Sequence, residues 1–194
     1  MHRIAKILTD YVIHKGTVDE SDRDTYEYGF IITVEVGLFV LFSLFITLYL
    51  HMFVEGIIFF SIFVPLRSYA GGLHLEKFQS CFILSCLTFS GTLLTVRYTQ
   101  MSIEGSFILI LFLEVLIYAL YPVENINRGV DSREDKYFRK KLKKFLLLDF
   151  IIATICVVWK KSDILCMETI VLCIVAITML MGKCKNGKMK ASDS

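Results

Sequence analysis

Long blocks of apolar residues follow one another along this chain, separated by short polar stretches. The blocks span residues 29–50, 53–66, 78–96, 103–122, 145–159 and 164–182. Only helices and closed barrels satisfy their backbone hydrogen bonds in lipid. The alternating strands of about ten residues that build a barrel do not occur here. The pattern therefore predicts an all-α polytopic integral membrane protein with about six transmembrane helices.

Two of these blocks are short for a membrane span, since crossing the hydrocarbon core takes about 20 helical residues. They are residues 53–66 and 145–159, and the first ends at Pro65. Proline removes a backbone donor and tends to kink or end a helix. The number of spans could therefore lie anywhere from about four to seven.

The N-terminal segment has a different pattern. Apolar side chains recur at helical spacing and form one stripe, at Ile4, Ile7, Leu8, Tyr11 and Val12. This predicts an amphipathic helix that either lies on the membrane surface or packs on the rest of the protein.

The whole chain is interpreted as a single membrane-embedded domain, residues 1–194. It divides into the N-terminal helix and linker (1–28), the transmembrane core (29–182) and a basic tail (183–194).

Positive charge is concentrated in two places, although the net charge is only +2. Residues 128–144 and the tail after residue 182 are rich in Lys and Arg. Because basic loops stay in the cytoplasm, both regions are expected to be cytoplasmic, together with both termini and residues 67–77. Lys160 and Lys161 alone fall on the wrong side, in a short turn. The small net charge gives no reason to expect a nucleic-acid partner.

The 6 cysteines do not resemble a disulfide framework or a thiolate metal site, because no CxxC pair occurs. An HExxH motif is also absent. No metal and no cofactor are expected.

The candidate chemistry lies in residues 67–81, which interrupt two apolar blocks. A thiol at Cys81 and an imidazole at His74 are the minimum set for cysteine nucleophilic catalysis. Cys81 is near the start of a predicted helix, where the helix dipole favours a thiolate. On one straight helix the two residues would be about 10.5 Å apart along the axis, so the dyad requires a bend. Gly71 and Gly72 supply a backbone able to make it.

Three carboxyl groups lie inside apolar blocks, at Glu35, Glu114 and Asp149. Ionisable groups at membrane depth are functional candidates by default. All three are expected at the depth of Cys81, in a water-accessible vestibule where Glu35 pairs with Arg67 or orients the imidazole. The alternative is structural pairing or snorkelling toward the interface.

The pattern R-x4-G-x-H-x6-C, formed by Arg67, Gly72, His74 and Cys81, resembles that of the AgrB family of bacterial membrane endopeptidases. The length, the multispan profile, the basic loop and residues 121–127 are also similar to that family. The resemblance implies a plasma-membrane enzyme of peptide quorum sensing that cuts the C-terminal tail from an AgrD-like propeptide. It implies Cys81 as nucleophile, His74 as base, and a thiolactone product, or a lactone if the peptide carries Ser. The sequence does not specify the oligomeric state, and the resemblance allows a homodimer.

Other residues have two interpretations each. Arg67 stabilises an oxyanion or a substrate carboxylate, or is an ordinary flanking cation. The run that includes Lys140 and Lys141 holds an acidic propeptide tail or contacts anionic lipid. Asn125 orients His74 or caps the chain. A competing function is a non-enzymatic export component for a small peptide.

Overall fold

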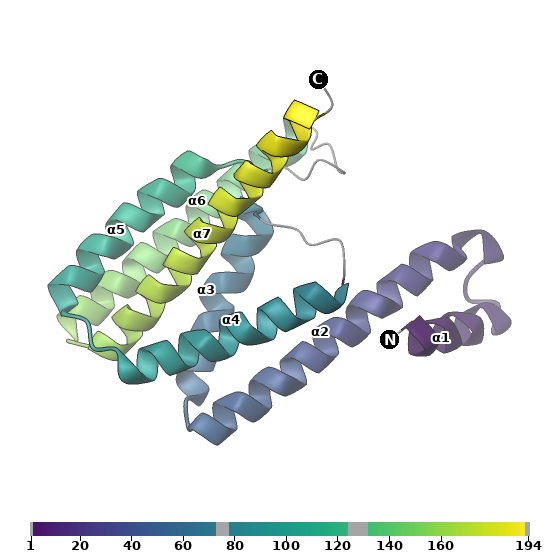
Figure 1. Cartoon of the computed structure of the whole chain (residues 1–194), viewed down its shortest axis with the longest axis horizontal. Helices are drawn as coiled ribbons and strands as arrows, with labels where there is room; N and C mark the ends of the chain where they lie inside the picture. The colour runs from purple at the N-terminus through teal and green to yellow at the C-terminus, as the bar shows by residue number, and fades with distance from the viewer. Residues whose placement is uncertain (1, 73–77, 124–131, 193–194) are drawn as a thin grey trace.

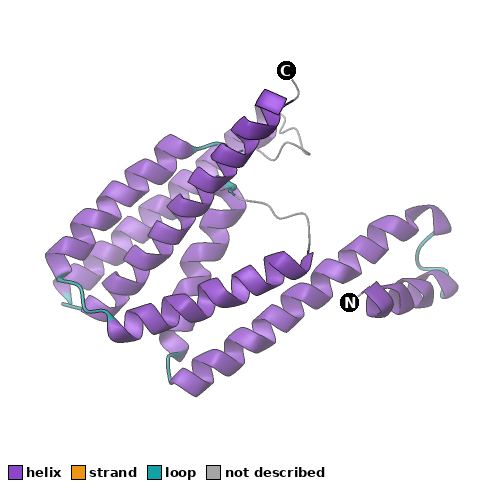
Figure 2. Cartoon of the chain, viewed as in Figure 1, coloured by secondary structure: helices purple, strands orange, loops and turns teal. Residues whose placement is uncertain are grey.

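The computed structural model describes residues 2–72, 78–123 and 132–192, and these residues are almost entirely helical (Figures 1 and 2). The elements are α1 (His2–His14), the short 3-10 helix η1 (Glu20–Asp22), α2 (Arg23–Leu50), α3 (Phe53–Ala70), α4 (Phe78–Tyr98), α5 (Ile103–Leu120), α6 (Ser132–Val158) and α7 (Ser162–Ser192).

Five segments are long and apolar enough to cross a membrane. They are Glu20–Leu50, Phe53–Ala70, Ser80–Tyr98, Ile103–Leu120 and Ser162–Gly187, which correspond to α2, α3, α4, α5 and α7. The sixth long helix, α6, joins a basic first half to an apolar second half. The prediction of an all-α polytopic membrane protein is confirmed.

Several helices extend beyond the apolar blocks that predict them. Helix α3 does not end at Pro65 but continues to Ala70. Its last turn is held by Leu66 and Ala70, which are both buried in the core. Helix α6 already begins at Ser132 and α7 continues to Ser192, so their basic stretches are helical as well. A hydropathy pattern locates the part of a helix that lipid surrounds, and it does not mark where the helix ends in water.

Helix α7 is the central element. It packs against α3, α4, α5 and α6, and 56% of its apolar span is buried, against 17% of the span that contains α2. Figure 1 shows α5, α6 and α7 side by side, with α4 and α2 extending to the other side of the molecule. The buried face of α7 carries apolar side chains of different sizes, among them Val171, Val175, Ala176 and Met179.

Helices α2, α3 and α4 meet through aromatic rings. The ring centroids of Phe59 and Phe89 are 5.0 Å apart, edge to face, and Phe39 on α2 contacts Phe60 at 5.7 Å. Such pairs are a favourable geometry for aromatic side chains. They tie α2 and α4 to α3, whose end carries the candidate site.

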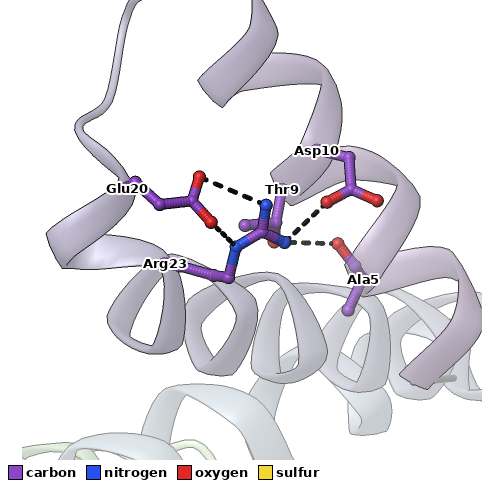
Figure 3. A network of polar contacts seen from close by, with 5 residues as sticks. All are labelled: Ala5, Thr9, Asp10, Glu20 and Arg23. Carbon is purple, nitrogen blue, oxygen red and sulfur yellow. Dashed lines mark hydrogen bonds and ion pairs between the residues drawn. The ribbon is translucent and has the colours of Figure 1, made fainter.

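Helix α1 lies beside the start of α2 and is joined to it by a polar clamp, shown in Figure 3. Arg23 donates hydrogen bonds to Asp10, at 2.6 Å, and to Glu20. Ala5 and Thr9 are buried in this contact. The apolar stripe that includes Ile7 and Tyr11 remains exposed, so packing on α2 leaves this stripe available to lipid.

Candidate active site

Cys81 is the fourth residue of α4, in its first turn. Its thiol is free and half-exposed. The hydroxyl of Ser85, one turn further along α4, is hydrogen-bonded to it. The first backbone N–H groups of a helix have no intrahelical partner, so this is a favourable position for a thiolate. Cys81 therefore lies near the start of the third span, as its sequence position suggests.

Arg67 is brought to this region by the last turn of α3. Its guanidinium lies directly over the backbone of Gly72, whose φ is +138°. A Cβ atom added at Gly72 would be 2.2 Å from Nη1 of Arg67 and 3.3 Å from the carbonyl oxygen of Thr178 on α7. Gly72 is thus the residue whose missing side chain leaves room for the arginine between α3 and α7.

Gly71 fixes the end of α3 against a distant part of the chain. It forms an isolated parallel bridge with Val123, which follows α5. A Cβ at Gly71 would be 2.3 Å from the carbonyl oxygen of Val123, and its φ is +79°. The glycine pair therefore makes the predicted bend possible and joins it to the segment after α5.

Two charges of opposite sign act on the Cys81 thiol. Arg67 interacts with it electrostatically, and so does Glu35 from α2. Three helices, α2, α3 and α4, thus converge on one thiol, and of the three carboxyl groups expected at this depth Glu35 is the one brought to it.

Glu114 and Asp149 lie elsewhere, within the α5–α6–α7 bundle. They interact with each other and with Glu168 on α7. The expectation that they share a vestibule with Cys81 is not met, because their helices turn them toward one another. Glu168 and Ser85 were missed by sequence reasoning. Glu168 is a carboxyl group inside the block 164–182, so the rule that selected Glu114 could have found it, whereas Ser85 matters only through its helical spacing from Cys81.

The basic first half of α6 lies at the same end of the bundle as the glycine bend. The Tyr121 hydroxyl, two residues before the bridge at Val123, donates a 2.8 Å hydrogen bond to Asp135 on α6. The guanidinium of Arg139 lies 5.5 Å from the Tyr121 ring centroid. Lys140 is exposed, and Lys141 lies over the ring of Tyr137 at 5.3 Å. Exposed positive charge therefore borders the region that contains Arg67.

His74, Asn125 and Asn127 lie outside the described residues. Among the residues that are described, no group of three or more His, Cys, Asp or Glu side chains could hold a metal ion. The described part of the site thus provides a thiol, a hydroxyl, a guanidinium and a carboxyl group. This set suits nucleophilic attack on a carbonyl followed by stabilisation of negative charge on oxygen.

A comparison with protein families gives one match over most of the chain. The sequence model of Accessory gene regulator B, AgrB, matches residues 4–181. The matched range includes most of α1, all of α2 to α6 and most of α7, with Arg67, Gly72 and Cys81 inside it. Comparisons with curated proteins and with solved structures gave no match.

Proposed function

Because the chain belongs to the AgrB family, we propose that it is a membrane cysteine endopeptidase with Cys81 as its nucleophile. Family membership implies processing of the AgrD propeptide in peptide quorum sensing. The finer proposal is that the enzyme removes the C-terminal tail of an AgrD-like peptide and cyclises the remainder. The observation that supports it is the position of Cys81 in the first turn of α4, beside Arg67.

The first step is attack of the Cys81 sulfur on the carbonyl carbon at the tail junction. A carbon–sulfur bond forms, the amide carbon–nitrogen bond breaks, and the tail leaves as an amine that takes up a proton. Arg67 and Glu35 oppose one another at the sulfur, so these two charges do not ensure a thiolate. A proton acceptor is therefore needed, and His74 takes this role by its family position, receiving the thiol proton and passing it to the leaving nitrogen.

The second step is capture of the acyl group by a thiol within the peptide. That thiol attacks the thioester carbonyl, Cys81 leaves as the thiolate, and a thiolactone ring results. A serine hydroxyl in the same place would give a lactone. Water is a competing nucleophile, so the site must exclude it and present the peptide thiol first. A thiol at the edge of an apolar span suits this demand.

Arg67 has a second task in this scheme. Both steps pass through a tetrahedral intermediate with negative charge on oxygen. A guanidinium held in place by Gly72 and the Thr178 region is a preorganised donor for that oxygen. Glu35, which acts on the thiol from α2, takes the role of a positioning residue.

The basic first half of α6 could bind the tail of the substrate. Lys140 and Lys141 lie at the end of the bundle that carries Arg67, within a run of basic residues. An acidic tail would be attracted to this segment and held near Cys81. The same charges favour a cytoplasmic location for this end of the molecule and for both termini.

Mass spectrometry of an AgrD-like peptide, incubated with the full chain in liposomes, tests the proposal. The wild type should yield a tail-less ring that is lighter than the linear acid by one water. Cys81→Ala should abolish cleavage while peptide binding persists. Cys86→Ala, a half-buried thiol on the same helix, is the matched control and should leave the product unchanged.

The same experiment separates this function from a role in peptide export. An export component would tolerate Cys81→Ala and move uncleaved peptide across the liposome membrane. Cleavage that persists in Cys81→Ala at the wild-type rate would exclude Cys81 as the nucleophile.

A further inference from the structure

Three acidic side chains from three helices lie together inside the α5–α6–α7 bundle, and the proposed reaction uses none of them. Asp149 on α6 interacts electrostatically with Glu114 on α5, and Glu168 on α7 interacts with both. Glu168 is 0% exposed and Asp149 is 3% exposed, while Glu114 is half-buried. These three residues are called the carboxyl cluster below.

Four of the six oxygen atoms of the carboxyl cluster are buried and lack hydrogen-bond partners among the described residues. Both carboxyl oxygens of Glu168, Oδ2 of Asp149 and Oε1 of Glu114 are buried without one. The hydroxyl of Ser106, two turns before Glu114 on α5, is also buried without a hydrogen-bond partner among the described residues. A buried carboxylate normally has a cation or several donors around it. A protonated, neutral carboxyl group needs far fewer such partners when it is buried.

Among the described residues, no positively charged group acts on Glu114, Asp149 or Glu168. The charged groups that act on Glu168 are the other two acids. The thiol of Cys156 on α6 is also near Glu168, and Lys161, in the turn after α6, acts on that thiol.

Helices α3 and α4 also pack on α7, and the arginines described on them lie away from the carboxyl cluster. Arg97, near the end of α4, points to the carbonyl of Leu50. Arg67 of α3 lies over Gly72, and Glu55 is at the opposite end of α3. The two ion pairs of Arg23, with Asp10 and Glu20, lie at the start of α2, far from this cluster.

From these observations we propose that Glu114, Asp149 and Glu168 form an intramembrane proton-binding site, in which at least two carboxyl groups carry a proton at neutral pH. Three carboxylates in an apolar interior would repel one another without any cation to offset them. The described residues do not have metal-ligand geometry here, so the proton is the cation that fits. It is taken from water onto a carboxyl oxygen, and no redox partner is involved. Half-buried Glu114 is the entry point from the surroundings.

Proton binding makes the packing of three helices depend on pH. With the protons in place, α5, α6 and α7 close around neutral acids. Loss of the protons places like charges between the helices, and α7 is the helix against which α3, α4, α5 and α6 all pack. This consequence is independent of the chemistry at Cys81, so it is tested on the Cys81→Ala variant as well as on the wild type.

Infrared spectroscopy of the full chain in liposomes gives the direct test. Protonated carboxyl groups have a C=O stretching band that shifts in heavy water. The wild type should show this band at pH 7, and Glu168→Gln and Asp149→Asn should each weaken it. Glu104→Gln, an exposed acid on α5, is the matched control and should leave it unchanged. Absence of the band at pH 7, or its persistence in a variant that lacks all three acids, would overturn the proposal.

Thermal unfolding in detergent provides a second readout. The melting temperature of the wild type should fall as pH is raised from about 6 to 9, because deprotonation then charges the bundle. In the triple variant Glu114→Gln, Asp149→Asn and Glu168→Gln, which keeps the shape of the neutral acids, the melting temperature should change much less over this range. Equal pH dependence in the two proteins would contradict proton binding at this cluster. Failure of the triple variant to fold would also contradict the proposal, because neutral amides would then be unable to replace the acids.

Discussion

Gly72 determines where the guanidinium of Arg67 can lie. Its φ of +138° is rarely adopted by residues with a side chain, and the space of a Cβ is already taken by Nη1 at 2.2 Å. Two separate effects, backbone strain and displacement of the arginine, therefore oppose any substitution here.

We expect Gly72→Ala to lower the rate of propeptide cleavage by at least about tenfold, because strain of roughly 1–3 kcal/mol falls on a residue next to the site. Cleavage rate at matched protein amounts is the measurement. Gly91→Ala on α4 is the control, since nothing lies within 4 Å of a Cβ there and its φ is ordinary. Equal rates in the two variants would show that the position of Arg67 does not matter.

At the residue scale, the sequence indicates which residue is the candidate nucleophile but not which side chains lie next to it. The position of Cys81 near a helix start follows from where an apolar block begins. Its partners Ser85 and Glu35 depend on helix phase and on which helices touch, which one sequence does not reveal. The same limit explains why Glu114 and Asp149 were expected beside Cys81: similar depth in the membrane does not mean the same face of the bundle.

At the scale of elements, the first half of α6 combines exposed charge with a fixed position. Tyr121 holds it through Asp135 and Arg139, so its lysines are presented at a constant place relative to the glycine bend. The apolar blocks predicted the membrane part of α6 but not these extra turns, because polar residues continue a helix without any hydropathy signal.

Neutralising Lys140, Lys141, Lys143 and Lys144 to Gln should raise the apparent KM for a peptide with an acidic tail, and more steeply at low salt. Kinetics at two ionic strengths check this. Lys160→Gln with Lys161→Gln, in the turn at the other end of α6, is the control and should leave KM unchanged. A loss of activity that does not respond to salt would count against electrostatic docking.

At the scale of the whole molecule, the arrangement depends on α7. Four other helices pack against it, and one side of it is buried in the core. Ala176 is 3% exposed, whereas its neighbour Ile177 is 54% exposed. The sequence predicts that residues 164–182 span the membrane. The span that contains α2 is almost as apolar, so hydropathy does not identify α7 as the central helix.

Ala176→Leu should lower the melting temperature in detergent by about 3–10 °C, since overpacking costs roughly 1–3 kcal/mol. Ile177→Leu, on the exposed side of the same helix, should change it by less than about 2 °C. Similar shifts in both variants would mean that α7 does not have the buried face described above.

The orientation of the molecule can be tested at the end of α7. Cys184 is an exposed thiol in the basic stretch. With this end in the cytoplasm, a membrane-impermeant maleimide should modify Cys184 in inside-out vesicles and not in intact cells. Lys161→Cys, in the turn at the other end of the bundle, should show the reverse. Labelling of Cys184 from outside would invert the proposed topology.

Helix α7 also has a consequence for biosynthesis. It is translated after α2 to α6, yet it supplies the surface on which α3, α4, α5 and α6 assemble. The earlier helices therefore enter the bilayer before their common partner exists, and lipid or the insertion machinery must cover their faces in the meantime. Assembly of these helices therefore waits for the synthesis of α7, and a ribosome stalled before residue 162 leaves α3 to α6 in the membrane without their common partner.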